Sequence, residues 1–181
     1  MKLKGKTILL GITGGIAAYK SPELVRLLKK NGADVHVVLT RAAQHFITPL
    51  TLQTVSQNPT HTDLFSLTQG QEIGHIHLAE KADIIVVAPA TADFLAKAAC
   101  GMADDLLTTL LLVTEAPVLL CPSMNCNMWK HSLTQKNIST LQKLGHKIME
   151  PEEGELACGM TGKGKMCEPE NICKEIYSLL R

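Results

Sequence analysis

The sequence predicts an α/β protein built on one parallel sheet, because two patterns recur along it. Short runs of apolar residues, long enough for strands that are buried on both faces, alternate with longer segments of helical character. Glycine or proline residues separate many of these segments. With 181 residues, 45% of them hydrophobic, the chain can bury one full core. We therefore expect a single domain, residues 1–181, in which a doubly wound sheet lies between two layers of helices.

The predicted elements follow one another in strand–helix order. The first strand runs over residues 6–11, and the helix after it carries Pro22 near its start and ends before Gly32. We expect the other strands at residues 34–40, 83–88, 117–121 and 146–149. We expect further helical segments at residues 41–57, 91–113, 132–144 and 169–180, with breaks at Pro49 and near Gly101. Residues 58–72 are polar and rich in turn formers. This order is that of a Rossmann-like or flavodoxin-like three-layer α/β/α fold.

The composition argues against several classes of protein. A formal net charge of +1 and 3% aromatic residues provide neither the basic surface nor the stacking platforms of a nucleic-acid-binding protein. No apolar run approaches the roughly 20 residues that span a bilayer. The six cysteines include no Cys-x-x-Cys pair, so we expect no metal site, and reduced thiols in the cytoplasm. The lysine-rich start imitates a signal peptide, but a strand, a glycine turn and a helix explain it better.

Chemically distinctive residues follow several of the predicted strands. The turn Gly11–Gly15 follows the first strand, Thr40 ends the second, and residues 89–93 and 122–125 follow two later ones. In a doubly wound sheet, ligands bind beyond the carboxyl ends of the strands. We therefore expect these four segments to form one site.

The glycine turn favours a phosphate group. Gly11–Gly15 is neither a G-x-G-x-x-G nor a Walker A sequence, but a tight turn before a helix offers backbone N–H groups to an anion. A turn required only for packing would have the same sequence. The second strand ends in Thr40 and Arg41 and not in the carboxylate that grips the ribose of NAD, which favours the phosphate of a mononucleotide.

Residues 89–93 end a strand and open a helix. Their small side chains would let a planar ring lie against the backbone, while Thr91 and Asp93 offer polar groups. Both residues could equally be ordinary helix N-caps.

Three further residues could carry chemistry, and each also has a purely structural interpretation. His75 precedes the third long strand and could act as an acid or base, although such histidines are usually structural. Asn125 could donate to a substrate carboxylate or cap the next turn. Cys158 lies among glycines in residues 154–166, which predict a mobile lid without regular structure. A free thiol there is mostly protonated at neutral pH and could donate its proton.

These segments together resemble a known family. The chain is similar to the flavin-containing cysteine decarboxylases over nearly its whole length, in the segments GITGGIAAYKSPELVRLL, TRAAQHFITPLTLQTVS, GHIHLAEKADIIVVAPATADFLAKAACGMADDLL, PSMNCNM and ACGMTGKGKM. Where the family usually has Pro-Ala-Ser-Ala-Asn-Thr, this chain has PATADF, so Asp93 replaces an amide with a carboxylate.

The resemblance implies a cofactor, an assembly and a set of residue roles. It implies FMN bound between the subunits of a homotrimer, with further assembly into a homododecamer. The residues implied to hold the flavin phosphate are Gly14, Gly15, Ile16 and Thr40, and those implied to face the flavin are Thr91, Ala92 and Asp93. The resemblance also implies that His75 and Cys158 are catalytic and that Asn125 binds the substrate carboxylate.

The implied substrate is 4'-phosphopantothenoylcysteine, a small molecule of coenzyme A biosynthesis, which a separate or fused phosphopantothenate–cysteine ligase would supply. Loss of CO2 from a cysteine amide leaves a carbanion without an electron sink. Oxidation of the CH2–SH carbon to a thioaldehyde by FMN provides that sink. Reduction of the resulting enethiol, with a proton from Cys158, then gives 4'-phosphopantetheine.

Other functions stay open within the same fold. A peptidyl-cysteine decarboxylase would stop at the enethiol and would therefore not need the Cys158 lid. A flavin prenyltransferase would need a second phosphate site, and it has no use for the Cys158 lid either. A non-catalytic flavin-binding regulatory protein would need the cofactor site alone. A serine hydrolase is disfavoured, because the chain has no Gly-x-Ser-x-Gly sequence.

Overall fold

The computed structural model describes residues 2–64, 74–157 and 159–181, without the side chains of residues 74–77. Within these residues the strands are β1 (Thr7–Ile12), β2 (Asp34–Leu39), β3 (Thr60–His61), β4 (Ile84–Ala90), β5 (Val118–Pro122), β6 (Lys147–Ile148), β7 (Glu152–Glu155) and β8 (Thr161–Lys165). The α-helices are α1 (Ser21–Lys30), α2 (Pro49–Ser56), α3 (Gly74–Lys81), α4 (Ala92–Ala99), α5 (Leu106–Val113), α6 (Cys126–Lys130), α7 (Ser132–Lys143) and α8 (Pro169–Leu179). The 3-10 helices are η1 (Ile16–Lys20) and η2 (Ala43–His45).

In the described part of the chain, six strands form one sheet in the order β3-β2-β1-β4-β5-β6. Every neighbouring pair in this sheet is parallel. This is the Rossmann strand order, in which the direction of winding reverses between β1 and β4. The predicted doubly wound α/β/α fold is confirmed.

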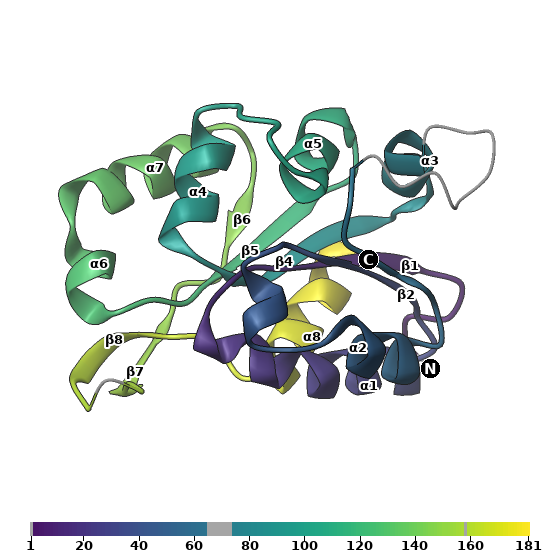
Figure 1. Ribbon diagram of the computed structural model, residues 1–181, viewed down its shortest axis with the longest axis horizontal. Helices are drawn as coiled ribbons and strands as arrows, with labels where there is room; N and C mark the ends of the chain where they lie inside the picture. The colour runs from purple at the N-terminus through teal and green to yellow at the C-terminus, as the bar shows by residue number, and fades with distance from the viewer. Residues whose placement is uncertain (1, 65–73, 158) are drawn as a thin grey trace.

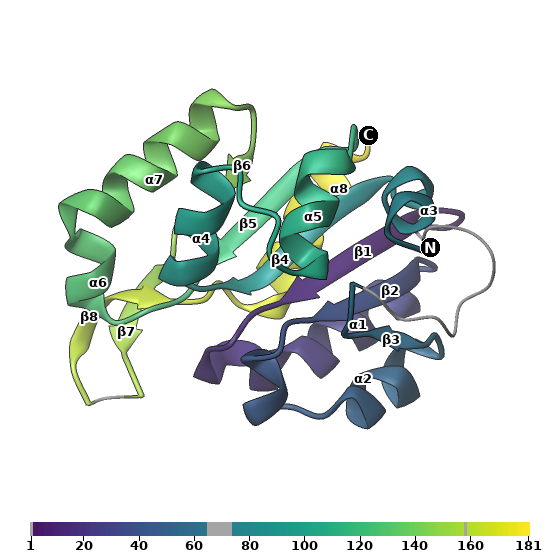
Figure 2. The same cartoon turned by 45° about the horizontal axis from the view of Figure 1, so that its top comes forward.

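Helices cover both faces of the sheet. Figures 1 and 2 show α1, α2 and α8 on one face and α3, α4, α5 and α7 on the other. Alternate residues of β1 enter different cores: Leu10 packs with the α1 and α8 side, and Leu9 packs with the α5 side. Because β4 and β5 are buried along their whole length, their apolar runs are continuous and not alternating.

One glycine at the centre of the sheet is required by packing. A Cβ on Gly11 would lie 2.5 Å from a side-chain carbon of Leu107 in α5. Gly11 therefore belongs to β1 and lets α5 approach the strand closely, so the turn proper begins only after Ile12.

Several elements were not predicted by the sequence. β3 lies in the polar segment after residue 57, α3 contains His75, and α6 follows Asn125. β3 and α6 are two and five residues long, too short for a periodic pattern to develop. The β7–β8 hairpin lies in the glycine-rich segment for which no regular structure was expected.

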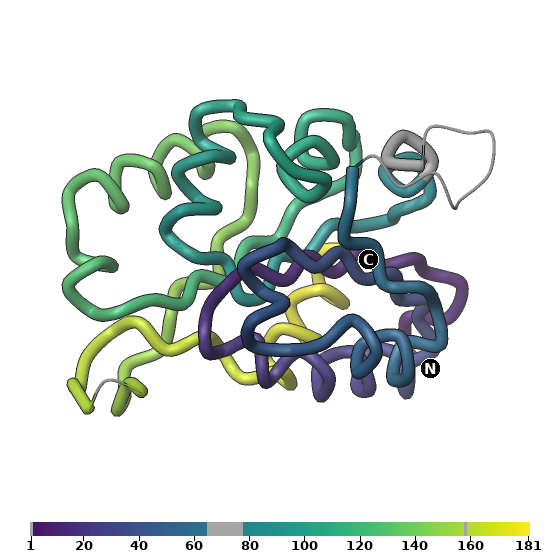
Figure 3. Tube along the Cα trace, in the orientation of Figure 1, coloured from purple at the N-terminus to yellow at the C-terminus, as the bar shows by residue number. Residues whose placement is uncertain are grey.

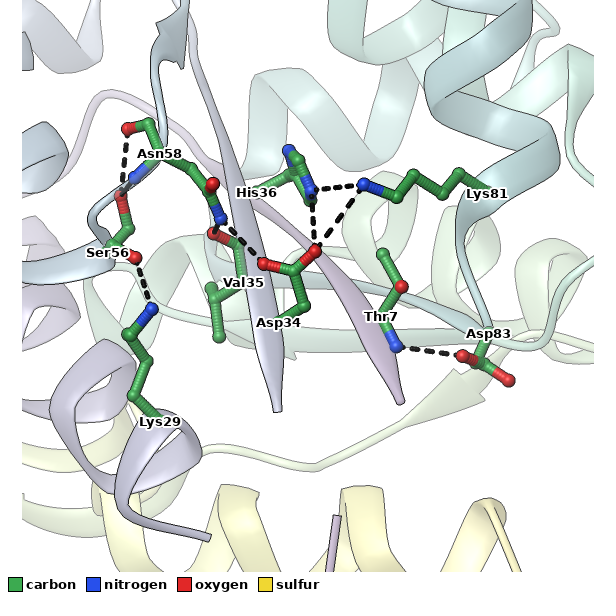
Figure 4. A network of polar contacts seen from close by, with 9 residues as sticks. All are labelled: Thr7, Lys29, Asp34, Val35, His36, Ser56, Asn58, Lys81 and Asp83. Atoms are coloured by element: carbon green, nitrogen blue, oxygen red, sulfur yellow. Dashed lines mark hydrogen bonds and ion pairs between the residues drawn. The ribbon is translucent and has the colours of Figure 1, made fainter. Parts of the chain in front are cut away.

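The amino-terminal edge of the sheet carries a polar network (Figure 4). Asp34, the first residue of β2, accepts a hydrogen bond from the Asn58 amide at 2.8 Å. The same carboxylate lies 3.1 Å from Nε2 of His36 and 3.4 Å from Nζ of Lys81. The network joins the end of α3 to β2, at the ends of the strands opposite the predicted site.

No helix in the described ranges is long and apolar enough to cross a membrane.

Candidate active site

A cavity of about 1240 Å³ opens at the carboxyl ends of the strands of the sheet. Its walls come from the turns after β1, β2, β4 and β5 and from the β7–β8 hairpin. The predicted site residues that line it are Gly14, Gly15, Ile16, Thr40, Thr91, Ala92, Asp93 and Asn125. The structure thus brings the four predicted segments together. This volume exceeds the range of about 300–1000 Å³ that is usual for a pocket that holds one small ligand.

Thr13 joins the ends of β1 and β4. Its hydroxyl donates to the carbonyl oxygen of Pro89 at 2.8 Å and accepts from the N–H of Thr91 at 3.0 Å. Thr13 is only 2% exposed, so these bonds are shielded from water. The hydroxyl therefore fixes the two turns that flank the point where the winding of the sheet reverses.

The turn after β1 leads the first residues of a helix along the cavity wall. η1 begins at Ile16 without a side-chain cap and continues directly into α1. The N–H of Ala18 donates to the carbonyl oxygen of Gly15 at 2.9 Å, so the amides of Ile16 and Ala17 are the ones at the start of the helix that are suited to an anion. A Cβ on Gly14 would lie 2.5 Å from the Cβ of Ala42, so a glycine is required where this turn meets the one after β2.

Thr40 directly follows β2 and lies beside this turn. Its N–H donates to the carbonyl oxygen of Ile12 at 3.1 Å, and its hydroxyl accepts from the N–H of Ala43 at 3.3 Å. The exposed Arg41 follows and also lines the cavity. The hydroxyl and guanidinium expected beside the glycine turn are therefore in place.

Residues 91–93 open α4 at the cavity. Thr91 is the N-cap of α4, with its hydroxyl accepting from the N–H of Phe94 at 3.3 Å, so its capping role is confirmed. The Asp93 side chain is 77% exposed and lies 3.5 Å from Nζ of Lys97, which lies 2.9 Å from Asp104. The hydrogen bond with Asp104 raises the pKa of Lys97 despite the opposing effect of burial. Lys97 is therefore a cation that balances the carboxylate of Asp93.

Asn125 is the N-cap of α6, as the structural interpretation expected. Its Oδ1 accepts from the N–H of Asn127 at 2.8 Å. Its Nδ2 lies 3.6 Å from the sulfur of Met160 beside the hairpin. The amide oxygen thus serves the fold, while the amide nitrogen is directed to the hairpin side of the cavity.

The glycine-rich segment forms an antiparallel β-hairpin, so the expectation of an irregular lid was wrong for its two strands. Figures 1 and 3 show the hairpin projecting from the body of the protein near α6. A Cβ on Gly164 would lie 2.2 Å from the carbonyl oxygen of Met124, and one on Gly162 would lie 2.9 Å from the Cβ of Cys126. The N–H of Met124 also donates to the carbonyl oxygen of Gly164 at 3.0 Å. These glycines therefore allow the base of the hairpin to dock on the turn that carries Asn125.

The two residues predicted to be catalytic are not described in full. Cys158 lies outside the described residues, between β7 and β8. The backbone of His75 lies in the first turn of α3, and its side chain is outside the description. Their roles stay predictions.

Two basic residues of the cavity were not predicted from the sequence. Lys20 in η1 and Lys165 at the end of β8 both line it, and both contact Glu168. Lys20 is only 8% exposed, which is rare for a lysine. Its position between apolar residues and the start of a helix was the only signal in the sequence.

A family comparison covers the whole chain. The model of the family described as Flavoprotein matches residues 1–181. The chain belongs to the flavoprotein family. The resemblance inferred from the sequence motifs is therefore confirmed at the level of the family.

This flavoprotein has curated relatives that are much longer than the chain. It is 54% identical over 172 residues to the "Coenzyme A biosynthesis bifunctional protein CoaBC" of Haemophilus influenzae, covering 95% of this chain and 43% of that protein. The chain thus spans less than half the length of this relative.

Solved structures with the same fold include two decarboxylases. One is a cysteine-to-serine mutant of PPC decarboxylase complexed with pantothenoylaminoethenethiol, with 31% identity, a TM-score of 0.84, and coverage of 94% of this chain and 96% of that chain. The other is the FMN-dependent cysteine decarboxylase SpaF, with 30% identity, a TM-score of 0.85, and coverage of 98% and 97%.

Proposed function

We propose that this flavoprotein is an FMN-dependent carboxy-lyase that converts 4'-phosphopantothenoylcysteine to 4'-phosphopantetheine in coenzyme A biosynthesis. The observation that carries the proposal is the meeting of the glycine turn, the start of α4, Asn125 and the hairpin around one cavity. The names of the relatives support the same activity, since CoaBC matches 95% of this chain and PPC decarboxylase matches its fold.

The residues around the cavity fit FMN. The uncapped first turn of η1, beside Thr40, suits the phosphate. A Cβ on Gly15 would lie 3.5 Å from the Cγ2 of Thr91, with no other non-neighbouring atom within 4 Å. A side chain at this position would therefore extend over the part of the cavity wall where the turns after β1 and β4 meet. With glycine there, no side chain projects from that part of the wall, and a planar ring can lie against it. When bound, FMN supplies a reversible hydride acceptor at the thiol-bearing carbon, which gives the electrons of the departing carboxylate a sink.

The chain's own residues bind the substrate and move protons. The amide N–H2 of Asn125 donates to the substrate carboxylate and holds the substrate in one orientation. The hairpin covers the substrate and excludes water. Cys158 gives its proton to the α-carbon after CO2 has left, and His75 acts as an acid or base at the reacting group.

We further propose a homotrimer with FMN between subunits, and assembly of trimers into a homododecamer. Ile16 and Tyr19 support this, because both line the cavity yet are 56% and 63% exposed. The two residues are three apart in η1 and so lie on one side of this 3-10 helix, where a partner subunit would cover them together. A phosphopantothenate–cysteine ligase, fused or separate, supplies the substrate, and the bifunctional relatives support this partner. The reaction takes place in the cytoplasm, where thiols stay reduced.

The test is to incubate the purified protein with 4'-phosphopantothenoylcysteine and to follow CO2 release and product mass. We expect a yellow protein that makes saturated 4'-phosphopantetheine. The variant Cys158→Ser should retain FMN and release CO2 but accumulate the enethiol. The control Cys100→Ser changes an exposed cysteine that does not line the cavity, and it should behave as wild type. A wild-type product that remains an enethiol would favour a peptidyl-type decarboxylase, and a protein that takes up no FMN would contradict the proposal.

A further inference from the structure

We propose that Lys165, with Lys20 behind it, forms an anion subsite that binds the phosphate group of the substrate. This inference rests on the proposed function, because it assigns a place to one end of the substrate named there. The two residues are called the lysine pair below.

The lysine pair is organised around one carboxylate. Nζ of Lys20 lies 2.8 Å from Oε2 of Glu168, and Nζ of Lys165 lies 2.8 Å from Oε1 of the same residue. The hydrogen bonds from Lys165 and Lys20 lower the pKa of Glu168, and the bond to Glu168 raises the pKa of Lys165. The carboxylate and the Lys165 ammonium therefore stay charged at neutral pH.

Both lysines of this cluster are at the cavity wall, and its carboxylates are not. Lys20 and Lys165 line it, whereas Glu168 and Glu152, the residue opposite Lys165 in the hairpin, do not. The Lys20 side chain is 9% exposed and shares its carboxylate partner with a second cation. Glu152 adds a second negative charge near Lys165, so both lysines are balanced within the protein. An anion on the cavity side would accept from ammonium N–H groups of Lys165 that do not point to Glu168, since a lysine has three donors.

The other charged groups of the cavity are placed elsewhere. Asp93 and Asp104 are on the α4 and α5 side, where Lys97 balances them. Glu155 also lines the cavity, but it pairs with Thr161 at the far end of the hairpin from Lys165. Arg41 lines the cavity after β2, beside the glycine turn, and Asp105 lines it as the N-cap of α5. The cavity therefore has basic groups at the hairpin base and after β2, and an acidic region at the starts of α4 and α5.

The proposed ligands bring three anionic groups, and the cavity offers three suitable places. The flavin phosphate matches the first turn of η1, and the substrate carboxylate matches Asn125. Arg41 lies beside the glycine turn and goes with the flavin phosphate. The phosphate of the substrate is the third anion, and the lysine pair is the cationic group of the cavity that remains for it. A lysine ammonium binds phosphate as a compact point charge with three donors.

The docked hairpin holds Lys165 in place before any ligand binds. The neighbouring Gly164 accepts a hydrogen bond from Met124, and any Cβ at that position would lie 2.2 Å from the carbonyl oxygen of Met124. The backbone of Lys165 is thus anchored to the turn that carries Asn125. A subsite on an anchored strand loses little freedom when the ligand binds, and this favours affinity.

The test compares ligands with and without the phosphate. We would measure kcat/KM for 4'-phosphopantothenoylcysteine and for pantothenoylcysteine in the wild type, Lys165→Gln, Lys165→Arg and Lys163→Gln. Lys163 is the matched control, because it lies on the same strand but contacts Glu150 and the Trp129 ring and does not line the cavity. Loss of one charge-assisted hydrogen bond should lower kcat/KM of Lys165→Gln for the phosphorylated substrate by about tenfold or more. The same variant should keep kcat/KM for pantothenoylcysteine within about twofold of the wild-type value. Lys165→Arg should keep most of the phosphate preference, and Lys163→Gln all of it.

Direct binding separates this inference from the proposed function. Calorimetry of 4'-phosphopantetheine and pantetheine, which both lack the carboxylate, needs no turnover. A wild type that prefers the phosphorylated ligand but shows no decarboxylation would contradict the proposed function alone. The subsite would be contradicted if Lys165→Gln weakened the binding of both ligands equally, or if it changed kcat/KM only for substrates that carry the carboxylate. Loss of FMN from Lys165→Gln would also contradict it, because Lys165 would then belong to the cofactor site. An unchanged phosphate preference in Lys165→Gln would also overturn it.

Discussion

Asn125 serves the fold through one end of its amide and, in the proposed reaction, the substrate through the other. Its oxygen caps α6 by accepting from the N–H of Asn127 at 2.8 Å. Aspartate caps a helix as well as asparagine does, so Asn125→Asp should leave the thermal midpoint nearly unchanged. The same change places an anion where the substrate carboxylate is proposed to bind. Since juxtaposed like charges cost several kcal/mol, we expect kcat/KM to fall by about 100-fold or more.

The matched control for this prediction is Asn127→Asp. It adds the same charge two residues along, at an exposed position that does not line the cavity. Its kcat/KM should stay close to that of the wild type. Equal turnover in Asn125→Asp and the wild type would show that Asn125 is a helix cap and no more.

The β7–β8 hairpin depends on the absence of one side chain. A Cβ at Gly164 would lie 2.2 Å from the Met124 carbonyl oxygen, which is main chain and cannot rotate away. Gly164→Ala should therefore push the hairpin off the turn that carries Asn125. Overpacking of this kind costs about 1–3 kcal/mol, and we expect a matching loss in the free energy of unfolding, measured with urea, together with a large loss of kcat.

Gly154→Ala separates the effect of the contact from that of adding a methyl group to the hairpin. The nearest atom to its added Cβ would be a Lys165 side-chain carbon at 3.7 Å, an ordinary contact. This variant should unfold and turn over like the wild type. If Gly164→Ala did the same, the hairpin would be free of the Met124 turn in solution.

The same hairpin shows what the sequence can and cannot predict. The strands of the sheet other than β3 were predictable, because runs such as TILLGI in β1 and IIVVAPA in β4 admit few alternatives. The position of the site followed from the rule for parallel sheets. A glycine needed for close packing, however, looks the same in sequence as one needed for mobility, and only the distance to Met124 distinguishes them. The burial of Lys20 was equally hidden, since its partner Glu168 lies 148 residues away.

In the molecule as a whole, the candidate site and the polar networks that stabilise the fold lie at opposite ends of the strands of the sheet. The carboxyl edge holds the cavity, and the amino-terminal edge holds Asp34 and Asp83 in polar networks (Figure 4). Burial tends to raise the pKa of Asp83, but hydrogen bonds from Lys6 and from the Thr7 N–H outweigh it, so the pKa lies below its usual value. The pKa of Asp34 is lowered in the same way, by bonds to Asn58 and His36.

These two carboxylates should make the protein sensitive to acid. Each binds a proton less readily in the folded than in the unfolded chain, so the unfolded chain takes up more protons as the pH falls through about 4. The stabilisation is therefore complete above that pH and is lost below it. In urea titrations, Asp83→Asn should be less stable than the wild type at pH 7, and the difference should shrink as the pH falls below about 4. Glu115→Gln, a change of an exposed carboxylate before β5, should follow the wild-type curve throughout. A constant difference between Asp83→Asn and the wild type from pH 7 to pH 3 would mean that the charge of Asp83 contributes nothing to stability.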